Sequence, residues 1–89
     1  MRKEGYIEHL RVAPPSIRLV SAADKLHNAR AVLADYRELG EKLWWRFHGG
    51  REGTLWYYRT VTDALRESGT SSFIEELERV VSEIERLAS

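Results

Sequence analysis

Residues 16–39 read SIRLVSAADKLHNARAVLADYREL, and this stretch decides the fold class because it predicts one long helix across the middle of the chain. Ser16 offers an N-cap oxygen at the start of the helix, and Gly40 offers a left-handed stop at its end. Between these ends, apolar residues recur every three or four positions, which places them on one side of a helix. This apolar stripe consists of Leu19, Ala23, Leu26, Ala29 or Arg30, and Leu33.

Helical pieces are also predicted on both sides of the long helix. Upstream, Pro14-Pro15 limits a first helix to about Arg2–Arg11, because proline lacks a backbone donor and disfavours the helical conformation of the residue before it. Downstream, residues 41–47 predict a short helical piece that His48-Gly49-Gly50 breaks. The glycine-rich stretch 49–54 fits no phosphate-loop spacing, so we expect a plain turn there.

Two further helices are predicted in the C-terminal part of the chain. The third begins at Thr54, or just before it, and continues to Ser68-Gly69. The fourth begins at Ser72, because Ser72 and Glu75 have the spacing of a capping box. Its apolar seam consists of Phe73, Leu77, Val80, Ile84 and Leu87. Since no strand-like alternation of useful length is present, we expect an all-α fold of about four helices.

The composition restricts the classes of partner. At 89 residues, with 43% hydrophobic residues, the chain is one domain at most and has enough apolar side chains for a modest core. Fourteen basic residues balance 14 acidic ones, which disfavours a nucleic-acid polymer or a membrane surface as partner. No cysteine is present and no apolar run is long enough for a signal peptide or a membrane span, so we expect a cytoplasmic protein.

Aromatic residues gather in two short segments. In a chain of balanced charge, core packing explains them better than a base-stacking platform, which accompanies a basic groove. The residues are Trp44, Trp45, Phe47, Trp56, Tyr57 and Tyr58.

Polar residues crowd the centre of the long helix. Asp24 and Asn28 are four residues apart and therefore share a face, where a carboxylate can hold a cation while the amide binds a group beside it. The alternative is that the two side chains form hydrogen bonds on a solvated face, which is the commoner fate of such a pair. Spacing alone favours this alternative.

The segment Leu19–Arg30, read as LVSAADKLHNAR, resembles the K-x-A-D-[RK]-L-H-N-x-R helix of RelA/SpoT-type guanosine polyphosphate hydrolases, which belong to the HD superfamily. Two further segments, Arg2–Ile7 (RKEGYI) and Gly53–Arg59 (GTLWYYR), are similar to small bacterial HD-domain phosphohydrolases. The resemblance thus covers most of the chain.

This resemblance implies a helical bundle around one divalent cation, usually Mn²⁺, held by a His, an adjacent His-Asp pair and a later Asp. Asp24 matches the later Asp, and Asn28 matches an asparagine that contacts the nucleotide. Lys25 and Arg30 match basic residues that flank the site, and Tyr57 is a looser match to a substrate-facing tyrosine. The implied substrate is a nucleotide-type phosphate.

The chain departs from the family upstream of Asp24. Only 23 residues precede Asp24, and they contain neither a His-Asp dipeptide nor the Glu-Asp pair that the family uses in catalysis. His9, His27 and His48 are followed by Leu, Asn and Gly. We therefore expect residues 1–89 to form a single partial HD-type domain, the C-terminal half only. One carboxylate holds a divalent cation weakly, so we expect no tightly bound Mn²⁺ and no activity from this chain alone.

A second hypothesis comes from the apolar content of this small chain. Loss of half a domain would leave apolar helix faces exposed, and such faces commonly form interfaces. On this interpretation the chain is a non-catalytic helical module that forms a homo-oligomer. The two hypotheses differ on whether Asp24 binds a metal.

Overall fold

The helical prediction is confirmed by a computed structural model, which describes residues 3–67 and 69–89. The prediction for Arg2 and Ser68 lies outside the described residues. Across the described parts of the chain there are helices and no strand. The elements are α1 (Lys3–Val12), α2 (Pro15–Leu39), the 3₁₀ helix η1 (Gly40–Arg46), α3 (Gly50–Arg66) and α4 (Ser72–Ala88).

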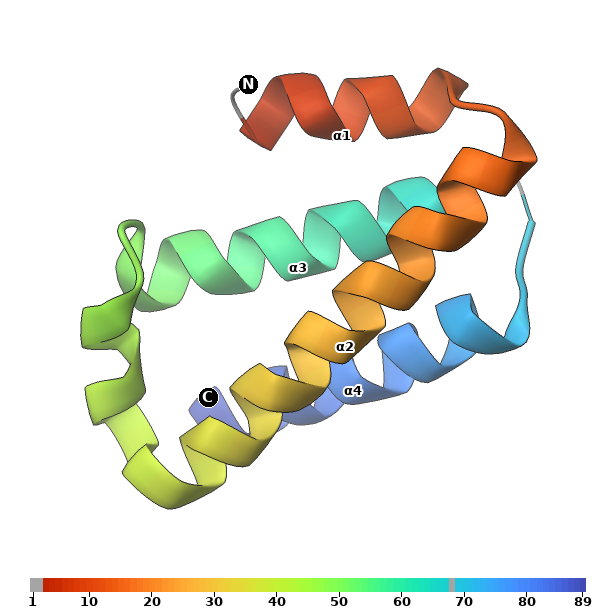
Figure 1. Cartoon of the computed structure of the whole chain (residues 1–89). Helices are drawn as coiled ribbons and strands as arrows, with labels where there is room; N and C mark the ends of the chain where they lie inside the picture. Colours follow the sequence, from red (N-terminus) through yellow and green to blue (C-terminus); the bar gives the residue numbers. More distant parts are fainter. Residues whose placement is uncertain (1–2, 68) are drawn as a thin grey trace.

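The long helix α2 organises the fold (Figure 1). It crosses the other helices diagonally and packs against α4, α3 and η1, while α1 packs against α3. The 3₁₀ helix connects the end of α2 to the beginning of α3, and both α1 and α3 begin on the same side of the molecule. In the described residues, no helix is both long and apolar enough to cross a membrane.

The core forms where α2, α3 and α4 meet. Leu65 and Leu77 are fully buried there, as is Val61. On α2 the predicted stripe is confirmed at Leu26 and Ala29, which are buried, but at its start the buried line passes through Ala22 rather than Leu19 and Ala23. Leu19 is 44% exposed, because the small alanines are the residues that face the neighbouring helices and allow a close approach.

The predicted seam of α4 is confirmed in its middle and differs at both ends, since Leu87 is half-buried and Ala88 is buried. Leu77, Val80 and Ile84 are buried as expected, but Ile74 is buried in place of Phe73, which is 42% exposed. A buried face wider than the narrow seam explains the difference, since α4 contacts both α2 and α3.

The predicted start of α2 is wrong by two residues, and that of α4 is wrong by one. The N-cap of α2 is Pro14, so that Pro15 occupies the first helical position, where its missing N–H has no intrahelical partner to lose. The N-cap of α4 is Ser71, whose Oγ accepts a hydrogen bond of 3.3 Å from the backbone of Ile74. The carboxylate of Glu75 accepts from Thr70 Oγ1 at 2.5 Å and does not complete a capping box with Ser72.

The expected turn over 49–54 is mostly helical, because α3 begins at Gly50. A Cβ atom on Gly49 would lie 3.1 Å from the Cα of Gly53, so this first turn requires a close backbone approach. Gly40, with φ of 64°, ends α2 as predicted, and the helical piece that follows is η1.

The aromatic residues divide between core and surface. Trp44 is buried against Tyr36 and Phe47, with ring centroids 5.4 and 6.3 Å away. Trp45, however, is 83% exposed and Trp56 is 44% exposed, so core packing does not account for them. On η1, Trp45 shares the exposed side with Lys42, three residues earlier, because residues i and i+3 are aligned in a 3₁₀ helix.

Candidate metal and phosphate site

Asp24 lies in the middle of α2, with a side chain that is 58% exposed. Its Oδ2 accepts a hydrogen bond of 3.3 Å from Lys25 Nζ. The exposed carboxylate oxygens therefore have acceptor positions for a further cation, since each ionised oxygen accepts more than one partner.

An open groove of about 520 Å³ runs between α1 and α2 and ends at Asp24. Its α2 wall includes Ile17 and Val20, which are 48% and 70% exposed. A hydrogen bond of 2.5 Å between Tyr6 Oη and Ser21 Oγ joins the two helices. The complete lining is Tyr6, His9, Leu10, Ser16, Ile17, Val20, Ser21 and Asp24.

Lys25, which follows Asp24 on α2, is largely covered. Its side chain is only 14% exposed, and its Nζ lies 5.0 Å from the ring centroid of Tyr6 and 5.8 Å from that of Tyr57. Both distances are within the range of a cation–π interaction. Burial lowers the pKa of Lys25, but the nearby oxygens of Tyr57, Tyr6 and Asp24 outweigh it and leave the pKa above its ordinary value. The ammonium group is therefore charged at neutral pH.

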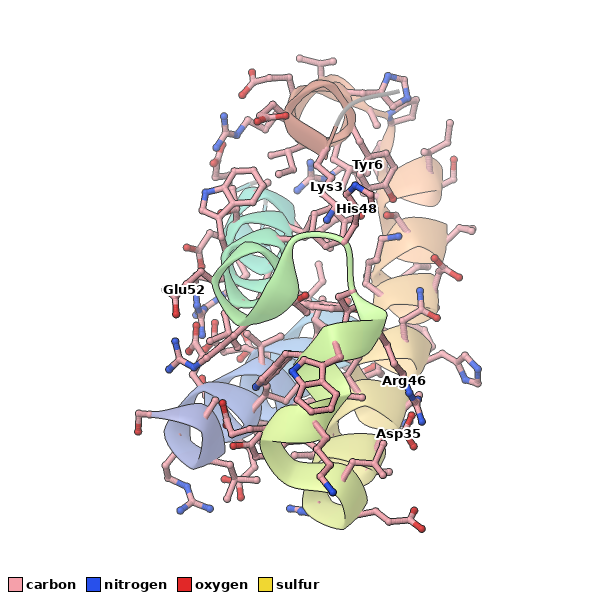
Figure 2. The ribbon with its side chains drawn as sticks, turned by 90° about the vertical axis from the view of Figure 1, so that its left-hand side faces the viewer. Lys3, Tyr6, Asp35, Arg46, His48 and Glu52 are labelled. Carbon is pink, nitrogen blue, oxygen red and sulfur yellow. The ribbon has the colours of Figure 1, made fainter. Side chains whose placement is uncertain are left out.

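A second lysine reaches the same tyrosine from α1. Lys3 Nζ lies 5.2 Å from the ring centroid of Tyr57, and Figure 2 shows Lys3 and Tyr6 together at one end of the molecule. Tyr57 also contacts Tyr58 edge to face, at 5.6 Å between centroids. Burial raises the pKa of Tyr58. Burial thus favours the neutral form of the Tyr58 phenol, which acts as a hydrogen-bonding group.

The remaining residues implied by the resemblance are divided between two sides of α2. Asn28 is half-buried, one turn after Asp24 on the same face. Arg30 is directed to α4, where its Nη2 lies 3.6 Å from Glu76 Oε2. The structure therefore brings Asp24, Lys25 and Tyr57 together, while Arg30 lies at a different surface.

Sequence reasoning missed Lys3 and Tyr6 as members of this cluster. The two residues are three apart on α1 and so share a face, which was a usable signal. The spacing gives no indication, however, that α1 folds back so that this face meets Lys25 and Tyr57. This contact depends on how α1, α2 and α3 pack together.

Within residues 3–67 and 69–89, no group of three or more His, Cys, Asp or Glu side chains is placed to hold a metal ion. Asp24 fits a metal as one carboxylate ligand, with oxygen atoms suited to Mn²⁺. Comparisons of the chain with protein-family models and with curated proteins gave no match.

Proposed function

We propose that this chain is the C-terminal part of a metal-dependent HD-type phosphohydrolase resembling guanosine polyphosphate pyrophosphohydrolases. In this proposal Asp24 is one metal ligand, and Lys25, Asn28 and Tyr57 contact a nucleotide-type phosphate substrate. Arg30, which the resemblance also implied, pairs with Glu76 at a different surface and is left out of the proposed site. The observation that carries the proposal is the position of Asp24: its exposed carboxylate lies at the end of an open groove and beside a covered ammonium group.

The groove supports the view that Asp24 works with residues from another polypeptide segment. A hydrolytic metal site ordinarily has three or more protein ligands, because a bound water loses its proton near neutral pH only at a well-held ion. Ile17 and Val20 expose apolar surface along the groove, which favours a helix as the occupant. A helix there that carries His and His-Asp motifs would add its ligands next to Asp24.

A reconstitution experiment tests this proposal. We expect the isolated chain to release no pyrophosphate from guanosine tetraphosphate in the presence of Mn²⁺. Addition of a polypeptide that carries the His and His-Asp motifs of the family should produce Mn²⁺-dependent release. In the reconstituted mixture, Asp24→Ala should abolish the activity, because the metal loses a ligand.

Asp35→Ala is the matched control, since Asp35 lies on the same helix but pairs with Arg46 at 3.1 Å. It should leave the reconstituted activity within about twofold of the unsubstituted chain, as distant surface changes usually do. Turnover by the isolated chain, or equal loss in both variants, would refute the proposal.

A second candidate function is self-association without catalysis. It is favoured by exposed apolar side chains at the end of α1 and in the first part of α2, where Val12 is 81% exposed and Val20 is 70% exposed. Here another copy of the chain would cover the groove. Sedimentation equilibrium distinguishes the two candidates, because a monomer at high concentration contradicts self-association and leaves the proposal for Asp24 intact.

A further inference from the structure

Two ammonium groups from different helices converge on one tyrosine. Lys3 of α1 and Lys25 of α2 lie 5.2 and 5.8 Å from the ring centroid of Tyr57, and Lys25 also lies over Tyr6. Two chain segments more than 20 residues apart therefore bring like charges to the ring of Tyr57. Like charges repel, so an arrangement of this kind favours an anion that contacts both.

The carboxylates of the chain neutralise only part of this charge. Asp24 pairs with Lys25, and its side chain remains 58% exposed. Among the described residues, no carboxylate forms an ion pair with Lys3. The cluster of Lys3, Tyr6, Lys25 and Tyr57 thus keeps an excess positive charge, although the chain as a whole has no net charge.

The neighbourhood of the cluster suits a compact polyanion. Lys25 is held in place by two aromatic rings, which reduces the entropy lost when it binds a ligand. Tyr57 adds a phenolic hydroxyl close to Lys25, and the phenol donates to an anionic oxygen. A polymer such as nucleic acid needs a longer basic surface, which a chain with balanced charges does not offer.

We propose that Lys3 and Lys25, together with the hydroxyl group of Tyr57, form a binding site for the pyrophosphoryl group of the substrate or product. The identification of the ligand rests on the proposed function, but anion binding at this cluster requires no metal. Lys3 and Tyr6 thereby become part of the substrate site, Lys3 as a contact and Tyr6 as a positioning residue that holds the Lys25 ammonium.

Titration with inorganic pyrophosphate, in EDTA and at low salt, tests this inference by calorimetry and by amide NMR shifts. We expect saturable binding that weakens as NaCl is raised, because the contact is ionic. Lys3→Gln and Lys25→Gln should each weaken binding by about tenfold, through loss of one charge-assisted contact. Lys42→Gln, an exposed lysine on η1, is the control and should bind like the unsubstituted chain.

Lys3 is exposed, so Lys3→Gln keeps the test decisive even if Lys25→Gln unfolds the chain. Absence of saturable binding, or equal binding by Lys3→Gln and Lys42→Gln, would overturn the inference. Tighter, lysine-dependent binding of a short DNA strand than of pyrophosphate would also overturn it.

Asp24→Asn separates this inference from the proposed metal site. Removal of the carboxylate beside Lys25 should preserve or tighten pyrophosphate binding in EDTA, because a competing negative charge is lost. If Asp24→Asn instead abolishes binding in the absence of metal while the fold is intact, the anion does not bind at these lysines.

Discussion

At the scale of single residues, two arginines complete the ends of helices. Arg18 is only 6% exposed, and its guanidinium group donates hydrogen bonds to the carbonyls of Leu10, Ala64 and Leu65. These carbonyls belong to the last turns of α1 and α3, where a helix supplies few donors, although Leu10 and Ala64 also accept long hydrogen bonds from the backbone of Ala13 and Glu67. Arg51 donates in the same way to the C-terminal end of α4, where its Nη2 lies 2.6 Å from Ala88 O. A cation at a helix C-terminus is also favoured by the helix dipole.

Replacement of Arg18 tests this role. Arg18→Met should lower the free energy of unfolding by about 2–4 kcal/mol, because buried carbonyls at two helix ends lose their charged donor. Urea denaturation followed by circular dichroism measures the change. Arg46→Met is the control, since Arg46 is exposed and should produce little change. Equal midpoints for the two variants would show that Arg18 does not join these helices.

At the scale of elements, α3 and α4 are joined by an ion-pair network centred on Arg59. Its guanidinium group donates to Glu78 at 2.8 Å and to Glu85 at 2.8 Å, and Arg66 also reaches Glu78. Hydrogen bonding from Arg59 lowers the pKa of Glu78 from 4.5 to about 2, and the hydrogen bonds to Glu85 and Glu78 raise the pKa of Arg59. The network therefore stabilises the ionised form of Glu78.

The lowered pKa predicts a specific pH dependence. A carboxylate whose pKa is lower in the folded state contributes stability above its unfolded pKa and loses it as the pH falls through the folded pKa. The contribution of Glu78 should be complete above about pH 5 and should decline between pH 5 and 2. Glu78→Gln should reduce the fall in Tm over this range, as measured by thermal unfolding at several pH values. Glu38→Gln is the control, because Glu38 lies on the exposed side of α2, and it should behave like the unsubstituted chain. If Tm depends on pH in the same way in the unsubstituted chain and in both variants, Glu78 does not have this role.

The helices themselves were predictable, because each carries apolar residues at helical spacing between proline, glycine or serine signals. Their exact starts were not, since Ser71 and Ser72 are both good N-caps and only the tertiary position of Ile74 decides between them. The buried line on α2 was predicted at Leu26 and Ala29 but not at Ala22, for a related reason. Two helices contact α2 from different directions, and a stripe drawn for one partner does not describe both.

At the scale of the whole molecule, the candidate site depends on how α1 returns to α2. The shared face of Asp24 and Asn28 follows from their spacing, and the resemblance to the HD superfamily suggested their chemistry. The contact between Lys25, Tyr6 and Tyr57 was not predictable, because it joins three helices that are separated along the chain. The burial of Arg18 was not predictable for the same reason, because it depends on contacts of α2 with the ends of α1 and α3.

The central claim is that this chain supplies one metal ligand, Asp24, to a site completed by other residues. Titration of Mn²⁺ into the isolated chain, followed by paramagnetic broadening of amide NMR signals, tests it most directly. We expect broadening centred on residues near Asp24 that requires roughly millimolar Mn²⁺, because few ligands hold the ion. Asp24→Asn should abolish the broadening and Asp35→Asn should not. Stoichiometric micromolar binding by a single copy of the chain, or broadening that persists in Asp24→Asn, would contradict the claim.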